Sequence, residues 1–471
     1  MSPTSPARGL WLREHPFWIA LALAVVVRLV VYAAFPPALV FSDGPTYLGM
    51  VDDLAPSPER PIGYGVLLWA LSALTRSLVL VSLSQALLGL VAAGIAYALL
   101  RRYDVSARLA TLAVVPLLFD AMQLVLEHSV LSDVLFEVLL LGAVAVLAWS
   151  PVPRLHRTVL AGVLLGTATV VRIVGEPTVL AAAVFLLLVA TSWRIRAVHV
   201  VAVCVAFALP LGAYAAWYHH DRGRWALTES SGRALYMRTT SFVDCAGLSV
   251  PAYERTLCPA DPLGSRQDPT YYGFHDERTL PRLHPPAGVS QDAAMRDFAT
   301  RAIRAQPADY AAVAGRDLAM AFWSPLRTDH FGYDTAHKWS FEYWVDHVPS
   351  STWEQPAYDA HGGGTQHTNQ PLAYVLAGYS FVVFLPGPVL LLLVLLAVAG
   401  LVVRRDDPAR TRPLIFLTLA LGFGLVLVPD LTAEFVWRYQ LPLIVLVPMA
   451  AALAWTRLHR QSGTTATPST D

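Results

Sequence analysis

Residues 41–64 have the sequence FSDGPTYLGMVDDLAPSPERPIGY and follow closely on the first long apolar run of the chain. The apolar run is long enough to cross a membrane, so this acidic stretch is expected to lie at the membrane surface. Asp43 lies in a Ser-Asp-Gly-Pro turn, a sequence that can hold a side chain rigidly. The stretch therefore predicts a carboxylate fixed at a membrane surface, directly behind a membrane-spanning helix.

The composition is 55% hydrophobic and 14% charged, with a mean hydropathy of +0.49. This is too apolar for a soluble protein of 471 residues. Apolar runs recur at close to the length of about 20 residues that a helix needs to cross hydrocarbon. An all-α polytopic membrane protein is predicted, with about ten transmembrane helices and a mixed extracytoplasmic domain between the seventh and eighth. The predicted spans are 17–36, 78–100, 107–126, 131–149, 158–175, 177–192, 197–217, 379–403, 413–429 and 440–456.

Arginines near the span ends set the predicted orientation, because basic residues are retained in the cytoplasm. They fall on alternate connections, which places both termini in the cytoplasm. Only one of the 34 basic residues is a lysine, Lys338, a composition that suggests a GC-rich bacterial genome, so a multi-pass protein of the bacterial cytoplasmic membrane is expected. The net charge is zero and the arginines line span ends rather than one folded face, so no nucleic-acid partner is expected.

Four regions are predicted along the chain. Residues 1–217 form an N-terminal membrane module of about seven helices, with the first outer loop at 37–64. Residues 218–371 are rich in aromatic, proline and charged residues and form the extracytoplasmic domain. Residues 372–460 contain about three further helices, and residues 461–471 form a disordered cytoplasmic tail.

The extracytoplasmic domain contains two cysteines, Cys245 and Cys258. In an oxidising compartment they can pair and close a loop of about 14 residues, which would stabilise the domain by roughly 3 kcal/mol. Two free thiols are the alternative. No second Cys or His pair stands beside them at zinc-ligand spacing. Residues 290–322 have apolar positions at helical spacing, so a helix is expected there.

Acidic residues of the membrane part all fall at the outer ends of spans or in short outer connections. Ionisable groups at membrane depth are costly and usually mark a site or a pathway. A transporter is expected to place such groups near the midplane of the membrane, whereas these gather on one side, as in an enzyme that opens outward. The residues are Asp43, Asp120, Glu127, Asp133, Glu176, Asp430 and Glu434.

Two of these carboxylates are candidate catalytic residues. Asp43 is placed to act as a general base, and burial beside apolar surface would raise its proton affinity; an Asp that only forms an Asx turn is the alternative. Asp133 begins a predicted helix, with Glu137 one turn further on the same face. Compensation of the helix dipole is the alternative for Asp133.

Arginines at outer span ends are candidates for binding a phosphate. Arg172 ends the fifth span and Arg438, followed by Tyr439, opens the last. A guanidinium matches phosphate oxygens in a bidentate manner. Snorkelling of the side chain to the membrane interface is the alternative for each of them. Arg28 lies deeper in the first span and is expected to pack against a carboxylate or a phosphate inside the bundle.

The order of these motifs resembles the polytopic GT-C glycosyltransferases, and most closely the branch of protein mannosyltransferases and lipid A aminoarabinose transferases. The resemblance covers about the first 215 residues and the last 40. It is carried by Arg28, SDGPTY at 42–47, RPIGY at 60–64, LSDVLFEVLL at 131–140, GVLLGTATVVR at 162–172 and RYQLPLIVLVP at 438–448.

The resemblance implies inverting transfer of a hexose or pentose from a polyprenyl-phosphate donor to a glycan, lipid or protein acceptor on the outer face of the membrane. Asp43 would be the catalytic carboxylate of the first loop, and Asp133 stands where many members have Glu. Residues on the donor-phosphate side would be Arg60, Arg172, Arg438 and Tyr439. Residues that position donor or acceptor would be Tyr47, Tyr64, Glu127 and Glu176.

The sequence is also compatible with a bound divalent metal and with two other classes of function. No obligatory cofactor is expected, although Asp43, Asp133 and His219 or His220 could ligate a divalent metal. A lipid-linked sugar flippase or polysaccharide exporter would also have many spans and arginines. A non-enzymatic polytopic scaffold would tolerate Asp43→Asn altogether.

Overall fold

The computed structural model describes residues 6–189, 192–323, 339–341, 359, 361, 367–404, 407 and 410–459, and the predicted tail at 461–471 lies outside them. Within this part of the chain every named element is helical, and the one β-bridge joins Leu39 to Ser129. The all-α architecture predicted from the apolar runs is therefore confirmed for the described residues.

Helices correspond to nearly all the predicted spans, but not all are long enough to cross a membrane. Five described helices are long and apolar enough, or six if the pair α16 and α17, bent by 45°, counts as one. Ten spans remain a prediction. The helices that match are α1 (Pro6–Ala34), α4 (Leu78–Arg102), α8 (Asp133–Ala148), α9 (Leu155–Val171), α10 (Thr178–Val189), α11 (Trp193–Arg222), α16 (Gln370–Val382), α17 (Gly387–Val402), α18 (Thr411–Thr432) and α19 (Leu441–His459).

The third predicted span, 107–126, is wrong as one helix. It is divided into α5 (Ala107–Ala113), α6 (Val115–Phe119) and α7 (Ala121–His128). Pro116 cannot donate a backbone hydrogen bond to the preceding turn, so it stands at the start of a new helix. Asp120 then caps α7 by accepting from the Met122 amide at 2.9 Å. The broken segment leaves Glu127 and the start of α8 in the interior of the bundle.

Small residues allow the helices of the bundle to approach closely. In α9, a Cβ at Gly166 would lie 2.3 Å from the carbonyl oxygen of Phe207 in α11. In α17, a Cβ at Gly400 would lie 2.4 Å from the Cβ of Ala454 in α19. Packing through small residues is the usual way in which membrane helices associate. It places α19 between α17 and α18, where most of its side chains are buried.

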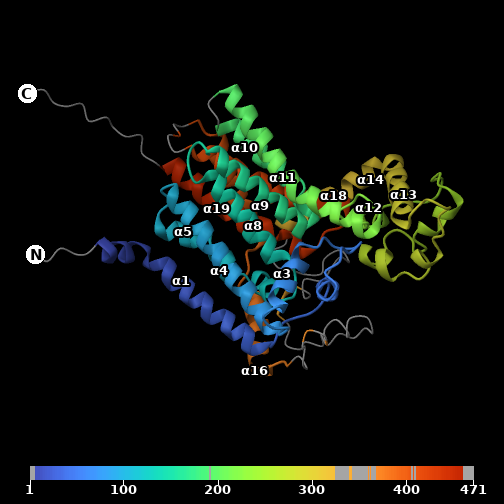
Figure 1. Cartoon of the computed structure of the whole chain (residues 1–471), viewed down its shortest axis with the longest axis horizontal. Coiled ribbons are helices and arrows are strands. Elements are labelled where there is room, and N and C mark those ends of the chain that lie inside the picture. Colours follow the sequence, from blue (N-terminus) through green and yellow to red (C-terminus); the bar gives the residue numbers. More distant parts are fainter. Residues whose placement is uncertain are drawn as a thin grey trace, which may run out of the picture.

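A polar domain, defined here as residues 231–323, lies at one end of the molecule, away from α5 (Figure 1). It contains α12 (Ser231–Thr240), α13 (Gln291–Ala305), α14 (Pro307–Trp323) and the short helical turns η2 (Ala252–Leu257), η3 (Tyr271–His275) and η4 (Leu280–Arg282). The helix expected over 290–322 is thus present as two helices. This domain has its own core, separate from that of the bundle, with Tyr236, Tyr272 and Phe298 fully buried.

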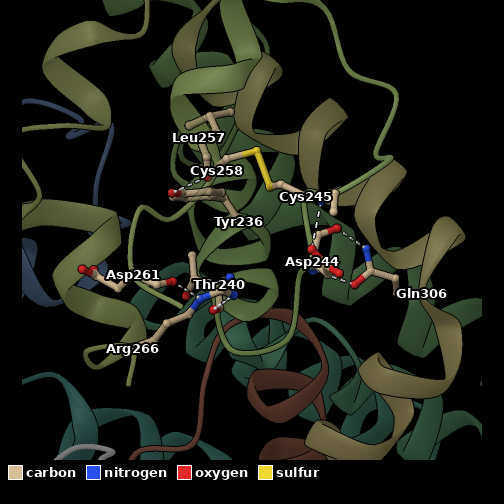
Figure 2. Close-up of a disulfide and its surroundings, with 10 residues drawn as sticks. Tyr236, Thr240, Asp244, Cys245, Leu257, Cys258, Asp261, Arg266 and Gln306 are labelled. Atoms are coloured by element: carbon tan, nitrogen blue, oxygen red, sulfur yellow. Dashed lines mark hydrogen bonds between the residues drawn. A yellow bond between two sulfur atoms is a disulfide. The ribbon is translucent and has the colours of Figure 1, made fainter. Parts of the chain in front are cut away.

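The sulfur atoms of Cys245 and Cys258 are bonded, with the two Cα atoms 6.1 Å apart. Figure 2 shows the disulfide beside Tyr236, whose hydroxyl donates to the carbonyl of Leu257 at 3.0 Å. The bond ties the end of η2 to the segment that follows α12, which connects the two sides of the core of the polar domain.

Glu254 in η2 makes the stability of the polar domain depend on pH. The side chain is fully buried, and burial raises the pKa of Glu254 to about 7, with the nearby Asp297 carboxylate adding to the shift. The folded state therefore keeps a proton that the unfolded state releases above about pH 4.3. Stability is expected to fall between about pH 4 and pH 7 and to level off above.

Glu254→Gln removes this cost, so its unfolding temperature in detergent should exceed that of the parent at pH 8 by more than it does at pH 5. Thermal unfolding followed by circular dichroism at the two pH values tests this. An equal difference at both pH values would contradict a titrating Glu254.

Candidate functional site

The carboxylate of Asp43 is free to bind other side chains because it does not cap its own helix. Asp43 precedes α2 (Gly44–Gly49), and its side chain makes no capping hydrogen bond. Its backbone holds the turn instead, with the Asp43 carbonyl accepting from the Tyr47 amide at 3.1 Å. The structure therefore does not support the alternative in which Asp43 only forms an Asx turn.

Two arginines from distant segments bind the two oxygens of Asp43. Arg60 Nη2 lies 2.7 Å from Oδ1, and Arg438 Nη2 lies 2.7 Å from Oδ2. Arg438 is in the short turn η7 (Trp437–Gln440) and its side chain is 7% exposed, whereas that of Arg60 is 32% exposed. Asp43 thus bridges one buried cation and one that is accessible.

The two guanidiniums reverse the predicted effect of burial on Asp43. Burial alone would raise the pKa of this carboxyl, but the charges of Arg60 and Arg438 and their hydrogen bonds outweigh it and hold the pKa well below its usual range. The expectation that burial would raise the proton affinity of Asp43 is therefore wrong. Asp43 serves as the counterion of both arginines.

A second ion pair stands beside the first. Arg172 Nη1 lies 2.5 Å from Asp133 Oδ1, and Arg438 Nε approaches the same oxygen at 3.9 Å. Asp133 is in the first turn of α8 and Arg172 ends α9. Arg438 therefore lies between both carboxylates, and the three predicted residues Asp43, Asp133 and Arg172 converge through it.

Both predicted tyrosines of the first loop are buried against this cluster. The Tyr47 hydroxyl hydrogen-bonds Ser132 Oγ at 2.9 Å, and the Tyr64 hydroxyl donates to Gln85 Oε1 at 2.9 Å. Their rings meet edge to face at 4.9 Å. Tyr47 and Tyr64 therefore anchor the loop that carries Asp43 to the helices of the bundle.

A cavity opens beside Arg438 and is polar at one end only. Asp133, Arg172, Arg438 and Tyr439 line that end, and Glu137 lies one helical turn beyond Asp133. The remaining walls are apolar side chains of α8, α18, α19 and the segment after α9. These are Phe136, Leu140, Leu141, Val174, Leu425, Leu441, Pro442, Val445 and Leu446.

Several buried polar atoms of the residues that line the cavity have no hydrogen-bond partner among the described residues. They are Nε and Nη1 of Arg438, Oδ2 of Asp133 and Oε1 of Glu137. An unpaired buried polar group costs about 1–3 kcal/mol, and more when charged. The Arg438 nitrogens could donate to an anionic group of a ligand, and the carboxylate oxygens could accept from its hydroxyl groups.

Two predicted positioning residues lie away from the cluster. Glu127 accepts from Arg28 at 2.6 Å, the partner expected for that deep arginine, and a Cβ at Gly89 would lie 2.0 Å from its Oε1. Gln123 links Glu127 to Glu137, so Glu127 reaches the cavity only through two other side chains. Glu176 is exposed and does not line the cavity. A direct positioning role for these two residues is thus not supported by their places.

Two contacts of the site were not predicted from the sequence. Ser132 bonds Tyr47 and lies 3.5 Å from Arg172 Nη1, and its position directly before Asp133 was the signal that could have found it. The Trp339 ring lies beneath the Arg438 guanidinium at 5.0 Å and beside Phe41 at 5.5 Å. No sequence pattern connects Trp339 with Arg438, because the two residues lie in separate segments of the chain.

Metal ligands do not converge in the described part of the chain, where no three His, Cys, Asp or Glu side chains could hold an ion. His219 instead stacks on Trp225 at 4.5 Å between ring centroids. Dependence on a metal remains a prediction to be tested.

Comparison with known proteins returned no matching family model and no matching curated protein. Among solved structures, a protein O-mannosyltransferase complex of S. cerevisiae bound to its sugar donor, Pmt1-Pmt2, matches 54% of this chain at 13% identity and a TM-score of 0.37. The chain spans 38% of that chain's length. ArnT from Cupriavidus metallidurans, solved with undecaprenyl phosphate, matches 94% of this chain and 77% of its own at 16% identity and a TM-score of 0.35.

Proposed function

We propose that the protein is a membrane glycosyltransferase that moves a sugar from a polyprenyl-phosphate donor to an acceptor hydroxyl at the outer face of the membrane. The observation that supports this best is a cluster of three arginines and two carboxylates, Arg60, Arg172, Arg438, Asp43 and Asp133. Arg172, Arg438 and Asp133 of this cluster line the polar end of an apolar cavity. A donor of this class combines an anionic phosphate with a long hydrocarbon chain, so it matches both ends of the cavity.

The phosphate is expected to bind at Arg438 and Arg172, with a share from Arg60 on the other side of Asp43. Nε and Nη1 of Arg438 have no hydrogen-bond partner among the described residues, and its guanidinium lies over the Trp339 ring. A phosphate oxygen would satisfy these donors through charge-assisted hydrogen bonds, which are about twice as strong as neutral ones. The polyprenyl chain would then follow the leucines and valines of α8, α18 and α19.

Binding of the phosphate would convert Asp43 from a counterion to a base. Asp43 neutralises Arg60 and Arg438, and these two guanidiniums keep its pKa low. Once the phosphate shares these guanidiniums, the carboxylate is less stabilised and its proton affinity rises. Donor binding and activation of the base are then coupled by the same two arginines.

The transfer step follows from this arrangement. Asp43 takes the proton of the acceptor hydroxyl while the acceptor oxygen attacks the anomeric carbon from the side opposite to the phosphate. The bond from the anomeric carbon to the phosphate oxygen breaks with its electron pair, and the configuration is inverted. The arginines stabilise the departing polyprenyl phosphate. The sugar is transferred to the acceptor oxygen, the proton to Asp43, and the phosphate leaves with the polyprenyl chain, so no further reactant is needed.

Lipid binding by the purified protein tests the proposal at its first step. Undecaprenyl phosphate should bind and raise the unfolding temperature, whereas undecaprenol of the same chain length should not, because it lacks the charge that Arg172 and Arg438 require. Native mass spectrometry in detergent would detect the adduct directly. Equal binding of the two lipids would show that the cavity recognises hydrocarbon only, and the proposed donor would then be wrong.

A further inference from the structure

Arg60, the more exposed partner of Asp43, is held in place from the polar domain. Arg60 Nη1 donates to the carbonyl of its neighbour Glu59 at 2.9 Å, so the position of residue 59 orients the guanidinium. The Glu59 carboxylate in turn receives both of its hydrogen bonds from Arg233 Nη1, at 2.7 and 2.9 Å. Arg233 lies in the first turn of α12 and its side chain is 19% exposed.

Further hydrogen bonds hold the same stretch of the first loop against the segment that leads into α12. Arg222 Nε donates to the carbonyl of Pro56 at 2.7 Å, and the amide of Glu229 donates to the carbonyl of Pro58 at 2.8 Å. Ser230 Oγ adds a bond to the carbonyl of Glu59 at 3.2 Å. Of these contacts, only the ion pair between Glu59 and Arg233 involves two charged side chains.

The other end of α12 contacts the C-terminal end of α18, which precedes the turn η7 that carries Arg438. Arg238 Nη1 donates to the carbonyl of Asp430 at 3.0 Å and pairs with Asp317 of α14 at 2.5 Å. Tyr310 of α14 donates to the carbonyl of Leu431 at 2.9 Å. A single ten-residue helix therefore touches the two segments that supply both cations of Asp43.

We propose that Arg233 is a positioning residue of the active site, which holds Arg60 against Asp43 by binding Glu59. The inference rests on the proposed function, because it assigns to Arg60 a share in phosphate binding. The Arg60 side chain is long, flexible and partly exposed. Its contribution to phosphate binding therefore depends on how firmly neighbouring residues fix its orientation before the phosphate binds. On this view α12 sets the distance between Arg60 and Arg438, and the polar domain takes part in donor binding without touching the donor.

A double-mutant cycle on undecaprenyl phosphate binding tests the inference. Arg233→Ala should weaken binding about three- to tenfold, in the range of measured coupling energies between contacting residues. Arg60→Ala should weaken it at least as much. The double variant should bind no more weakly than Arg60→Ala alone, because Arg233 acts only through Arg60. Glu59→Ala should reproduce the loss, and Arg233→Lys should recover part of it.

Arg301→Ala is the matched control, since Arg301 forms an exposed pair with Asp297 inside the polar domain. It should leave binding unchanged. Additive losses in the cycle, or normal binding by Arg233→Ala, would overturn the positioning role. Normal binding by Arg60→Ala would exclude Arg60 from phosphate binding and would also overturn the positioning role, whereas the proposed function itself would fail only if Arg438→Ala also bound normally. A role of Arg233 in folding alone predicts an equal loss whether or not Arg60 is present, which the cycle separates from positioning.

Discussion

Replacing Asp43 with asparagine is expected to lower sugar transfer by roughly 10²-fold to 10⁴-fold, the range that loss of a general base produces. The amide keeps the shape of the side chain but cannot accept the acceptor proton. Binding of undecaprenyl phosphate should be unchanged or tighter, because Arg60 and Arg438 lose the carboxylate that competes with the phosphate for them. The combination of lost chemistry and retained binding is specific to the proposed mechanism.

The measurement is transfer from a polyprenyl-phosphate hexose to an acceptor by the purified variant, with lipid binding followed in parallel. Asp52→Asn is the matched control, because Asp52 is in the same loop and pairs with Arg76 at the surface. It should retain transfer. Near-normal transfer by Asp43→Asn would exclude the base, and loss of both transfer and binding would indicate that Asp43 only maintains the loop. A flippase or scaffold predicts no separation of the two measurements.

Arg438→Ala is expected to have the largest effect on donor binding, a loss of about 30-fold or more in affinity for undecaprenyl phosphate. Removing one partner of a buried charged hydrogen bond costs about 2–5 kcal/mol in comparable interfaces. Here the loss is compounded because Asp43 and Asp133 both lose a neighbouring positive charge. Arg438→Lys should restore part of the affinity, since it keeps the charge but loses the planar fork.

The Arg438→Ala protein could also be less stable, because an unpaired buried carboxylate destabilises a fold. The double variant Asp43→Asn with Arg438→Ala relieves that cost and provides the control. It should unfold at a higher temperature than Arg438→Ala and still bind undecaprenyl phosphate weakly. If its affinity returned to that of the parent protein, Arg438 would stabilise the site without contacting the phosphate.

The sequence predicted the local features of the fold and the identity of the charged residues, but not their pairing. Apolar runs revealed most of the bundle helices because their length and composition are local properties. The third span failed because Pro116 and Asp120 break a helix that hydrophobicity alone would continue. Asp43 and Arg438 were both named as candidates, yet nothing local indicates that residues so far apart form an ion pair.

The direction in which the pKa of Asp43 is shifted could not be predicted from the sequence. Burial could be expected from the apolar surroundings, but the pKa depends on which charges lie within a few ångströms. Arg60 and Arg438 supply those charges from two separate segments, and they outweigh burial. Glu127 lies away from the cavity for a related reason, since its position in the bundle is set by Arg28. Pairings of this kind are properties of the assembled bundle.

The contact between Asp43 and Arg438 joins residues 395 positions apart, and this has a consequence for the timing of biosynthesis. At about 5–20 residues per second, a ribosome needs about 20–80 s to pass from one to the other. During that interval the nascent chain contains Asp43 and Arg60 but lacks η7, which carries the second guanidinium. A ribosome-stalled chain would therefore present an acidic loop that is available to insertion factors and proteases and incapable of catalysis.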